Sequence, residues 1–203
     1  IMKRILILLL TISLISCSND DETQNAQPNY SAFLNNRTPS LMGKLNSQSF
    51  SWKFGWNEYQ MSTGYDNGNG VCSITDPVRI LMFGLSTDDA STQLTFITPK
   101  MDTSNQNEVK SVLSVGEKQF GDIYNKFQFR ILKNNNFYII NPNTNQKLEI
   151  LKTDEFLNYD NKKHMLVWIK IDNLELENSN QSGEKIQLKD GFMIAELYGH
   201  IFE

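Results

Sequence analysis

The sequence predicts an all-β domain, an antiparallel sandwich or barrel-like fold of about eight to eleven strands with one short helix. Two observations carry this prediction. Short runs rich in Ile, Leu, Val, Phe and Tyr recur along residues 41–203, and clusters of Asn, Asp, Gly and Ser separate them, which is typical of strands joined by turns. Only one stretch, residues 103–113, combines apolar residues at helical spacing with a capping pattern.

The predicted strands follow one another at short intervals. Residues 78–85 are apolar on both faces, as a central buried strand should be. Asp190-Gly191 lies between two β-rich runs and predicts a hairpin turn there. The full set of predicted strands is 41–44, 47–56, 78–85, 93–98, 126–132, 137–140, 147–152, 165–176, 185–188 and 192–198.

The helix predicted at 103–113 has recognisable ends. Thr103 and Gln106 fit a capping box. Val109 continues the helical spacing, and Gly116 is suited to close the helix. A further helical turn is expected at 154–159.

Residues 1–16 read as an export signal. Lys3 and Arg4 supply the positive start, and residues 5–15 supply an apolar core. Since a bilayer span needs roughly 20 apolar residues, this core suits a signal peptide better than a membrane helix.

The end of the signal, Leu14-Ile15-Ser16-Cys17, resembles the lipobox of bacterial lipoproteins. The resemblance implies cleavage before Cys17, a diacylglyceryl group on its thiol and a further acyl chain, such as palmitate, on its new amino terminus. Several acyl chains would hold the protein durably on a membrane. An ordinary signal peptide with a chance cysteine is the alternative.

The residues after Cys17 bear on the location of the protein in the cell envelope. Ser18 resembles the residue that sorts lipoproteins to the outer membrane. The acidic run 20–22 resembles a surface-export signal of Bacteroidetes lipoproteins, or is simply part of a solvated tether. Residues 17–40 are polar and lack periodicity, so we expect the lipidated cysteine and a flexible tether there and a single β-rich domain at 41–203.

Both ends of the expected domain carry a family resemblance. Residues 43–52, GKLNSQSFSW, and residues 186–195, IQLKDGFMIA, resemble the start and the terminal hairpin of small Bacteroidetes-type outer-membrane lipoproteins of unknown function. The resemblance implies a β-rich envelope lipoprotein, and it carries no catalytic residues.

Charge and cysteine content exclude some functions. The chain has 19 basic and 23 acidic residues, and loss of Lys3 and Arg4 with the signal makes it more acidic still. Nucleic acid is therefore not an expected partner. With Cys17 lipidated, Cys72 is the remaining thiol, and we interpret it as a small buried residue.

Aromatic residues suggest one kind of ligand. A strand over 47–56 would place Phe50, Trp52, Phe54 and Trp56 on one face, and Trp168 lies on another predicted strand. Exposed aromatic rings of this kind stack on sugars, whereas buried ones would simply belong to the core. Trp52, Trp56 and Trp168 are thus candidate ligand-binding residues, with the core as the alternative.

No metal site, cofactor or catalytic residue is predicted. Residues 66–70, DNGNG, read as a turn rather than a calcium loop, and the two histidines, His164 and His200, lack ligand neighbours at metal-binding spacing.

The expected function follows from the anchor and the β-domain. We expect a non-enzymatic lipoprotein of the outer membrane, held by lipid on Cys17, that serves as a binding or structural module of the cell envelope. The alternatives are a carbohydrate-binding surface lipoprotein that uses the tryptophans, a partner of another envelope protein, and a small envelope hydrolase.

Overall fold

Antiparallel pairing organises the structure, a computed structural model that describes residues 29–55, 59–66, 77–122, 124–143, 145–159 and 161–198. The strand pairs in these ranges are antiparallel, which confirms the predicted fold class. The strands are β1 (Ser40–Leu45), β2 (Gln48–Lys53), β3 (Tyr59–Asp66), β4 (Val78–Thr87), β5 (Thr92–Ile97), β6 (Met101–Asp102), β7 (Gly116–Gln119), β8 (Gln128–Lys133), β9 (Asn136–Ile140), β10 (Lys147–Leu157), β11 (Lys163–Asn178) and β12 (Lys185–Tyr198), and the helices are α2 (Tyr30–Asn35) and α3 (Gln106–Val112).

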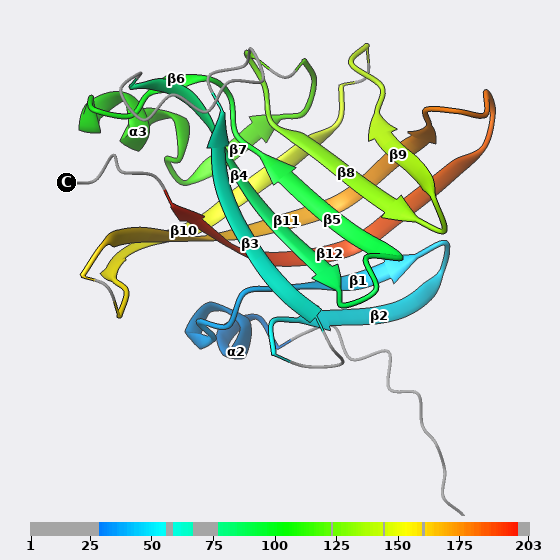
Figure 1. The fold of residues 1–203 in the computed structure, drawn as a ribbon, viewed down its shortest axis with the longest axis horizontal. Helices are drawn as coiled ribbons and strands as arrows, with labels where there is room; N and C mark the ends of the chain where they lie inside the picture. Colours follow the sequence, from blue (N-terminus) through cyan, green and yellow to red (C-terminus); the bar gives the residue numbers. More distant parts are fainter. Residues whose placement is uncertain are drawn as a thin grey trace, which may run out of the picture.

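The sheet curls on itself. Its main path runs β2-β1-β12-β11-β9-β8-β5-β4-β3. Strands β3, β4 and β5 cross in front of β11 and β12 (Figure 1), and residues of β3 and β4 contact β12. Because neighbouring strands are rotated in a constant sense, the twist accumulates over a long sheet and rolls it up. The product is a barrel-like curled sheet whose inner face is the core.

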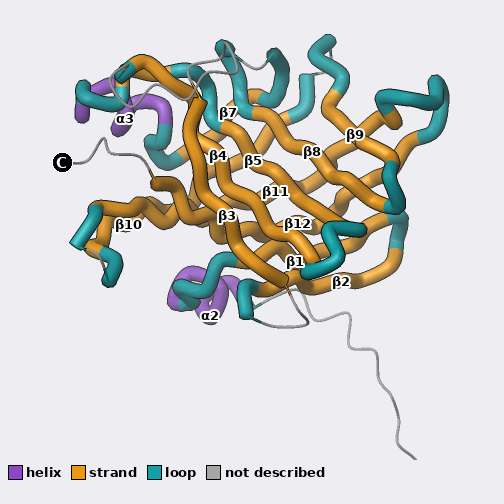
Figure 2. Tube along the Cα trace, viewed as in Figure 1, coloured by secondary structure: helices purple, strands orange, loops and turns teal. Residues whose placement is uncertain are grey.

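The hairpin of β11 and β12 is the longest pairing in the sheet. Its register runs from His164↔Tyr198 to Glu177↔Lys185. On its other edge β11 pairs first with β10 and then with β9, and β7 pairs with the outer edge of β10. Strands β10 and β7 therefore form a side branch of the sheet, with α3 beside it (Figure 2).

Aromatic side chains dominate the inside of the curl. Phe83, Phe96 and Phe129 have no exposed surface. The ring of Phe96 stacks on that of Phe127 with centroids 5.5 Å apart. Rings of this size bury large apolar areas, so they supply much of the stabilising free energy of a core of this kind.

Strand β11 is buried on both faces. Val167 and Ile169 point into the main core, whereas Leu166 and Trp168 belong to a second cluster on the outer face. Helix α2 covers this second cluster through Phe33, which is 4% exposed. A continuous apolar run is the expected sequence of a strand that is covered on both sides.

Both helices differ from the sequence prediction. Helix α3 begins at Gln106, and its N-cap is Asn105, whose Oδ1 accepts hydrogen bonds from two backbone amides of the first turn. Thr103 instead donates its hydroxyl to the carbonyl of Pro77. Gly116 starts β7 rather than ending the helix. Helix α2 lies within residues 17–40, so the packed structure begins before residue 41, where the sequence placed the start of the domain.

The prediction of a hairpin turn at Asp190-Gly191 is wrong. Strand β12 runs through these two residues without interruption, and Gly191 pairs with Ile171 of β11. Asp190 has a positive φ of 51°, and the register of β12 with β1 shifts at the same place. The Asp-Gly pair therefore supplies the backbone freedom for a β-bulge instead of a turn.

The predicted helical turn at 154–159 and the predicted strand at 47–56 also differ from the structure. Residues 154–157 continue β10, so no helical turn forms in that part. Strand β2 ends at Lys53, and Phe54 lies in a turn with 44% of its surface exposed. The predicted strand over 47–56 is thus shorter, and Phe54 does not join a common face with Phe50 and Trp52.

Candidate functional site

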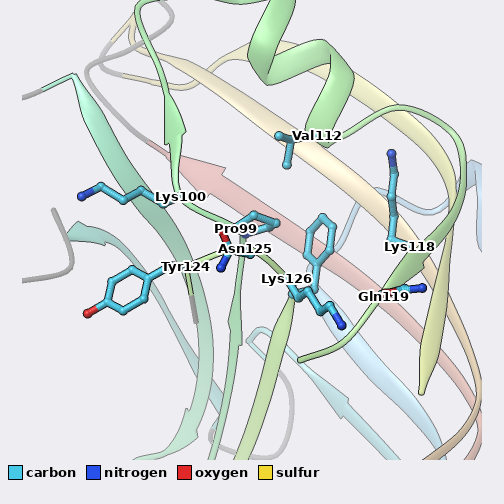
Figure 3. Close-up of a pocket in the computed structure, with 9 residues that line it drawn as sticks. Pro99, Lys100, Val112, Lys118, Gln119, Tyr124, Asn125 and Lys126 are labelled. Atoms are coloured by element: carbon cyan, nitrogen blue, oxygen red, sulfur yellow. The ribbon is translucent and has the colours of Figure 1, made fainter. Parts of the chain in front are cut away.

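A cleft with a cationic rim lies between α3, β7 and the loop that joins β7 to β8. Its volume is about 430 Å³. Pro99, Val112 and Phe127 supply the apolar part of its lining. Figure 3 shows Val112 directed toward the cleft from α3, with Pro99 near the centre. We call this feature, together with the lysines described next, the lysine cleft.

Three lysines line the cleft: Lys100, Lys118 and Lys126. Within the described ranges none of the three makes an ion pair with a carboxylate, whereas Lys147 pairs with Glu117 at 2.7 Å close by. Their ammonium groups point to different sides of the cleft (Figure 3). The lysine cleft therefore carries positive charge spread around its rim.

Lys118 is the most constrained of the three. Its Nζ donates to the Ser111 carbonyl at 3.1 Å and to Ser114 Oγ at 2.7 Å. Burial lowers the pKa of Lys118 below its ordinary value of 10.5. The ammonium has lost part of its water shell, because burial disfavours the charged form of a lysine.

A turn beginning at Asp122 shapes the loop on one side of the cleft. The Asp122 carboxylate accepts hydrogen bonds from the backbone amides of Tyr124 and Asn125, at 3.2 and 3.0 Å, and from Asn125 Nδ2 at 2.8 Å. Desolvation acts to raise the pKa of Asp122, but these hydrogen bonds and the charge of Lys126 outweigh it and lower the pKa. Asp at the start of such a turn replaces a backbone acceptor.

Two more contacts hold this loop to the sheet. The amide of Lys100 donates to the carbonyl of Tyr124 at 2.9 Å, and the side chain of Gln128 donates to the carbonyl of Gly121. A Cβ at position 121 would collide with the stem of Lys126. Glycine at this position thus lets the Lys126 stem lie against the backbone.

Polar and aromatic groups complete the rim. Tyr124 is 47% exposed, and Gln119 and Asn125 are exposed at its sides. Primary amides donate and accept hydrogen bonds, and a phenol ring offers an apolar face. The cleft thus combines cations, amides and one exposed ring.

A second hollow of about 490 Å³ lies on the other side of α3. Lys110 of α3 lines it together with Asp154 and Glu155 of β10. Asp154 also forms an ion pair with Arg37. Charges of both signs line this hollow, whereas the charged residues that line the lysine cleft are all lysines.

His164 belongs to a buried polar group that the sequence did not indicate. Its Nδ1 lies 2.5 Å from Glu196 Oε1, and its Nε2 lies 3.1 Å from Asn158 Nδ2. Asn158 Oδ1 accepts from the amide of Lys162 at 2.9 Å, which leaves Nδ2 to face the histidine. Both ring nitrogens are therefore engaged, and the ring stacks on Tyr198 with centroids 4.6 Å apart.

The three candidate tryptophans occupy different situations. Trp168 has no exposed surface, and its indole Nε1 donates to the carbonyls of Phe33 and Asn36. Trp168 therefore offers no ring face to an external ligand in this structure. Trp52 is half-buried and packs on the main core, with the ring of Phe50 at 4.6 Å. Trp56 lies outside the described residues.

Several other predicted features also lie outside the described residues. These are the lipidation site Cys17, the thiol Cys72, the turn at 67–70 and His200. In the part that the structure describes, no group of three or more His, Cys, Asp or Glu side chains is arranged to hold a metal ion. No helix among the described residues is long and apolar enough to cross a membrane.

The lysine cleft was not among the sequence-predicted sites. Its lysines are separated by 18 and 8 positions in the sequence, on a loop, a strand and a second loop. No sequence pattern connects them, because only the fold brings these three segments to one cleft. No family model, no curated protein and no solved structure matches the chain.

Proposed function

We propose that the protein is a lipid-anchored, non-catalytic binding module of the bacterial outer membrane, attached through Cys17. The Leu-Ile-Ser-Cys sequence at 14–17 supports the anchor. The lysine cleft supports the binding role, and it is the observation that carries the proposal. An open cleft with an apolar part and a few placed polar groups is the usual form of a ligand site.

The His164 group favours a structural role over a catalytic one. The Nε2 atom of a catalytic histidine would face a nucleophile or a substrate. Here Nε2 lies 3.1 Å from Asn158 Nδ2, while Nδ1 is engaged by Glu196. The group fastens the β10–β11 turn to β12, so the proposal assigns it to stability.

A palmitate-labelling experiment tests the anchor. The full-length chain is expressed in a Gram-negative host with an alkyne-bearing palmitate, and the label on the protein is read after click coupling. We expect labelled wild type and unlabelled Cys17→Ala. The matched control is Cys72→Ala, since the chain contains two cysteines, and this variant should keep the label. Label on Cys17→Ala would overturn the proposed anchor.

Membrane fractionation tests the proposed location in the outer membrane. Density-gradient separation of membranes should place the wild-type chain with the outer membrane. Ser18→Asp should move it toward the inner membrane, because residue 18 directly follows the lipidated cysteine. Wild-type protein in the inner-membrane fraction would contradict the outer-membrane assignment.

A further inference from the structure

On the basis of the binding role proposed above, we propose that the lysine cleft binds an acidic saccharide chain, with a carboxylate or sulfate on successive sugars. The inference names the ligand class of the same site. It rests on four properties of the cleft: a charged lining of one sign, spacing of the charges, an apolar and aromatic contact surface, and prior ordering of its groups.

The first property is a charged lining of one sign. The chain as a whole is acidic, with a formal net charge of −4. The charged residues that line the cleft are nevertheless all lysines: Lys100, Lys118 and Lys126. The Asp122 carboxylate, which interacts with the charge of Lys126, is engaged by the amides of its own turn. A local cationic field on an acidic protein attracts anions selectively.

The second property is the spacing of the charges. The ammonium groups of Lys100, Lys118 and Lys126 diverge around the cleft instead of converging on one point (Figure 3). A single phosphate is best held by donors that converge on its oxygens. Diverging cations fit a ligand that carries its anionic groups at intervals.

The third property is the contact surface between the charges. Pro99 and Val112, both half-buried, give apolar contact, and the Tyr124 ring is exposed at the rim. The C–H face of a sugar ring packs on such surfaces, while its hydroxyls need groups that both donate and accept. The exposed amides of Gln119 and Asn125 meet that need.

The fourth property is prior ordering. Ser111 and Ser114 already fix the Lys118 ammonium, and its lowered pKa reflects water already removed by burial. Asp122 fixes the turn that carries Asn125. Groups ordered and partly desolvated before binding lower the free-energy cost of binding.

Single-stranded nucleic acid is also a chain of repeated anions, but one observation favours the saccharide. Single-strand sites stack successive bases on several rings, whereas Tyr124 is the single exposed ring that lines this cleft.

The test is a binding titration of the purified full-length protein in detergent micelles. The probes are matched pairs: an oligogalacturonate with its neutral methyl ester, and a sulfated dextran oligomer with unmodified dextran. A dT oligonucleotide and inorganic phosphate are added as competitors. We expect one acidic member to bind at least about tenfold more tightly than its neutral counterpart, and its affinity to fall as salt is raised.

Variants tie the binding to the cleft. Lys100→Gln and Lys126→Gln should each weaken binding of the acidic oligomer about three- to tenfold, and Tyr124→Ala should weaken it to a similar extent. Lys133→Gln and Lys189→Gln replace exposed lysines outside the cleft and should leave binding unchanged. Thermal melting of each variant confirms that it is folded.

Five outcomes would overturn the inference: no binding of either acidic oligomer, equal binding of neutral and acidic members, tighter binding of the dT oligonucleotide, complete competition by inorganic phosphate, or preferred binding of a neutral member that depends on Tyr124. The last outcome would overturn the ligand class and leave the proposed binding module intact. Palmitate labelling of Cys17 reports the anchor independently of all these results.

Discussion

The indole Nε1 of Trp168 donates a hydrogen bond to the carbonyl oxygen of Asn36 at 2.9 Å, across 132 positions of sequence. Asn36 is the C-cap of α2, where carbonyls lack partners within the helix. A buried indole N–H also needs an acceptor. One hydrogen bond therefore satisfies both the Asn36 carbonyl and the indole N–H. The Lys152 ammonium lies over the indole, 4.5 Å from the ring centroid.

Replacement of this tryptophan should loosen α2 specifically. Trp168→Phe removes the N–H and leaves a void in the second cluster, so we expect a loss of about 2–4 kcal/mol in the free energy of unfolding. Chemical denaturation measures the loss, and hydrogen exchange should rise more in residues 30–36 than in β5. Trp52→Phe, at a half-buried position on the main core, is the control and should not raise exchange in α2. Unchanged exchange in α2 of Trp168→Phe would contradict the role of the indole.

Gly43 is expected to tolerate no side chain. Its φ is +155°, and an added Cβ would lie 2.9 Å from the carbonyl oxygen of Lys189 and 3.0 Å from Gly191 Cα. Gly43→Ala should cost about 2–4 kcal/mol of stability, since backbone strain and a backbone collision add. The control is Gly55→Ala, where φ is +75° but the space is open, and which should cost about 1 kcal/mol. Urea denaturation measures both losses. Equal losses of unfolding free energy in Gly43→Ala and Gly55→Ala would rule out the collision.

The Tyr138–Glu184 pair should make stability depend on pH at both extremes. Tyr138 Oη donates to Glu184 at 2.7 Å. This bond, followed by one from Asn178, lowers the pKa of Glu184 below 4.5, and the Glu184 carboxylate raises the pKa of Tyr138 above 10.0. The unfolded chain then binds more protons in acid, so the contribution of Glu184 is lost as the pH falls from about 4.5 through its folded pKa. The contribution of Tyr138 is lost as the pH rises from about 10 through its raised pKa.

Melting temperatures between pH 2 and pH 11 measure this dependence. Glu184→Gln keeps an acceptor for Tyr138 but no longer titrates. Its melting temperature should therefore fall less at acid pH than that of the wild type. Glu155→Gln, at an exposed position on β10, should reproduce the wild-type profile. An identical acid limb in wild type and Glu184→Gln would refute the assignment.

The histidine network predicts a single tautomer for His164. Asn158 presents a donor to Nε2, so a neutral ring should carry its proton on Nδ1, facing Glu196. Long-range ¹H–¹⁵N NMR of the neutral imidazole should show a protonated Nδ1 and an unprotonated Nε2. Asn158→Ala should lose this preference and increase exchange at Lys162, whose amide it caps. Asn145→Ala, at an exposed position, is the control. A dominant Nε2–H signal in the wild type would falsify the network.

Periodicity and turn chemistry predicted the fold class because they are local properties. The strand at 78–85 appears as β4, and the apolar spacing around Val109 appears as α3. The hairpin prediction at Asp190-Gly191 was wrong because a turn and a β-bulge need the same backbone freedom in φ. Only the pairing of this segment with Ile171 and with β1 decides that a bulge forms. The helix α2 was missed because six residues carry little periodicity. It becomes stable only through Phe33 and its packing on Phe192, at 5.0 Å between ring centroids.

The candidate site could not be predicted for a related reason. Trp168 was open to two interpretations, ligand residue or core, because a sequence shows the aromatic character of a strand but not what covers its outer face. Lys100, Lys118 and Lys126 looked like ordinary surface lysines, since their shared cleft depends on a long-range arrangement of loops. His164 and Glu196 are 32 positions apart, and only the register of β11 with β12 brings them together.

The position of β12 in the sheet limits when the sheet can be completed during synthesis. β1, the first of the described strands, pairs with β12, the last of them, and β12 also forms the long hairpin with β11. Pairings between segments far apart in the sequence form slowly, because a long stretch of chain must be brought together first. The pair of β1 and β2 can therefore join the rest of the sheet only once β12 has been made.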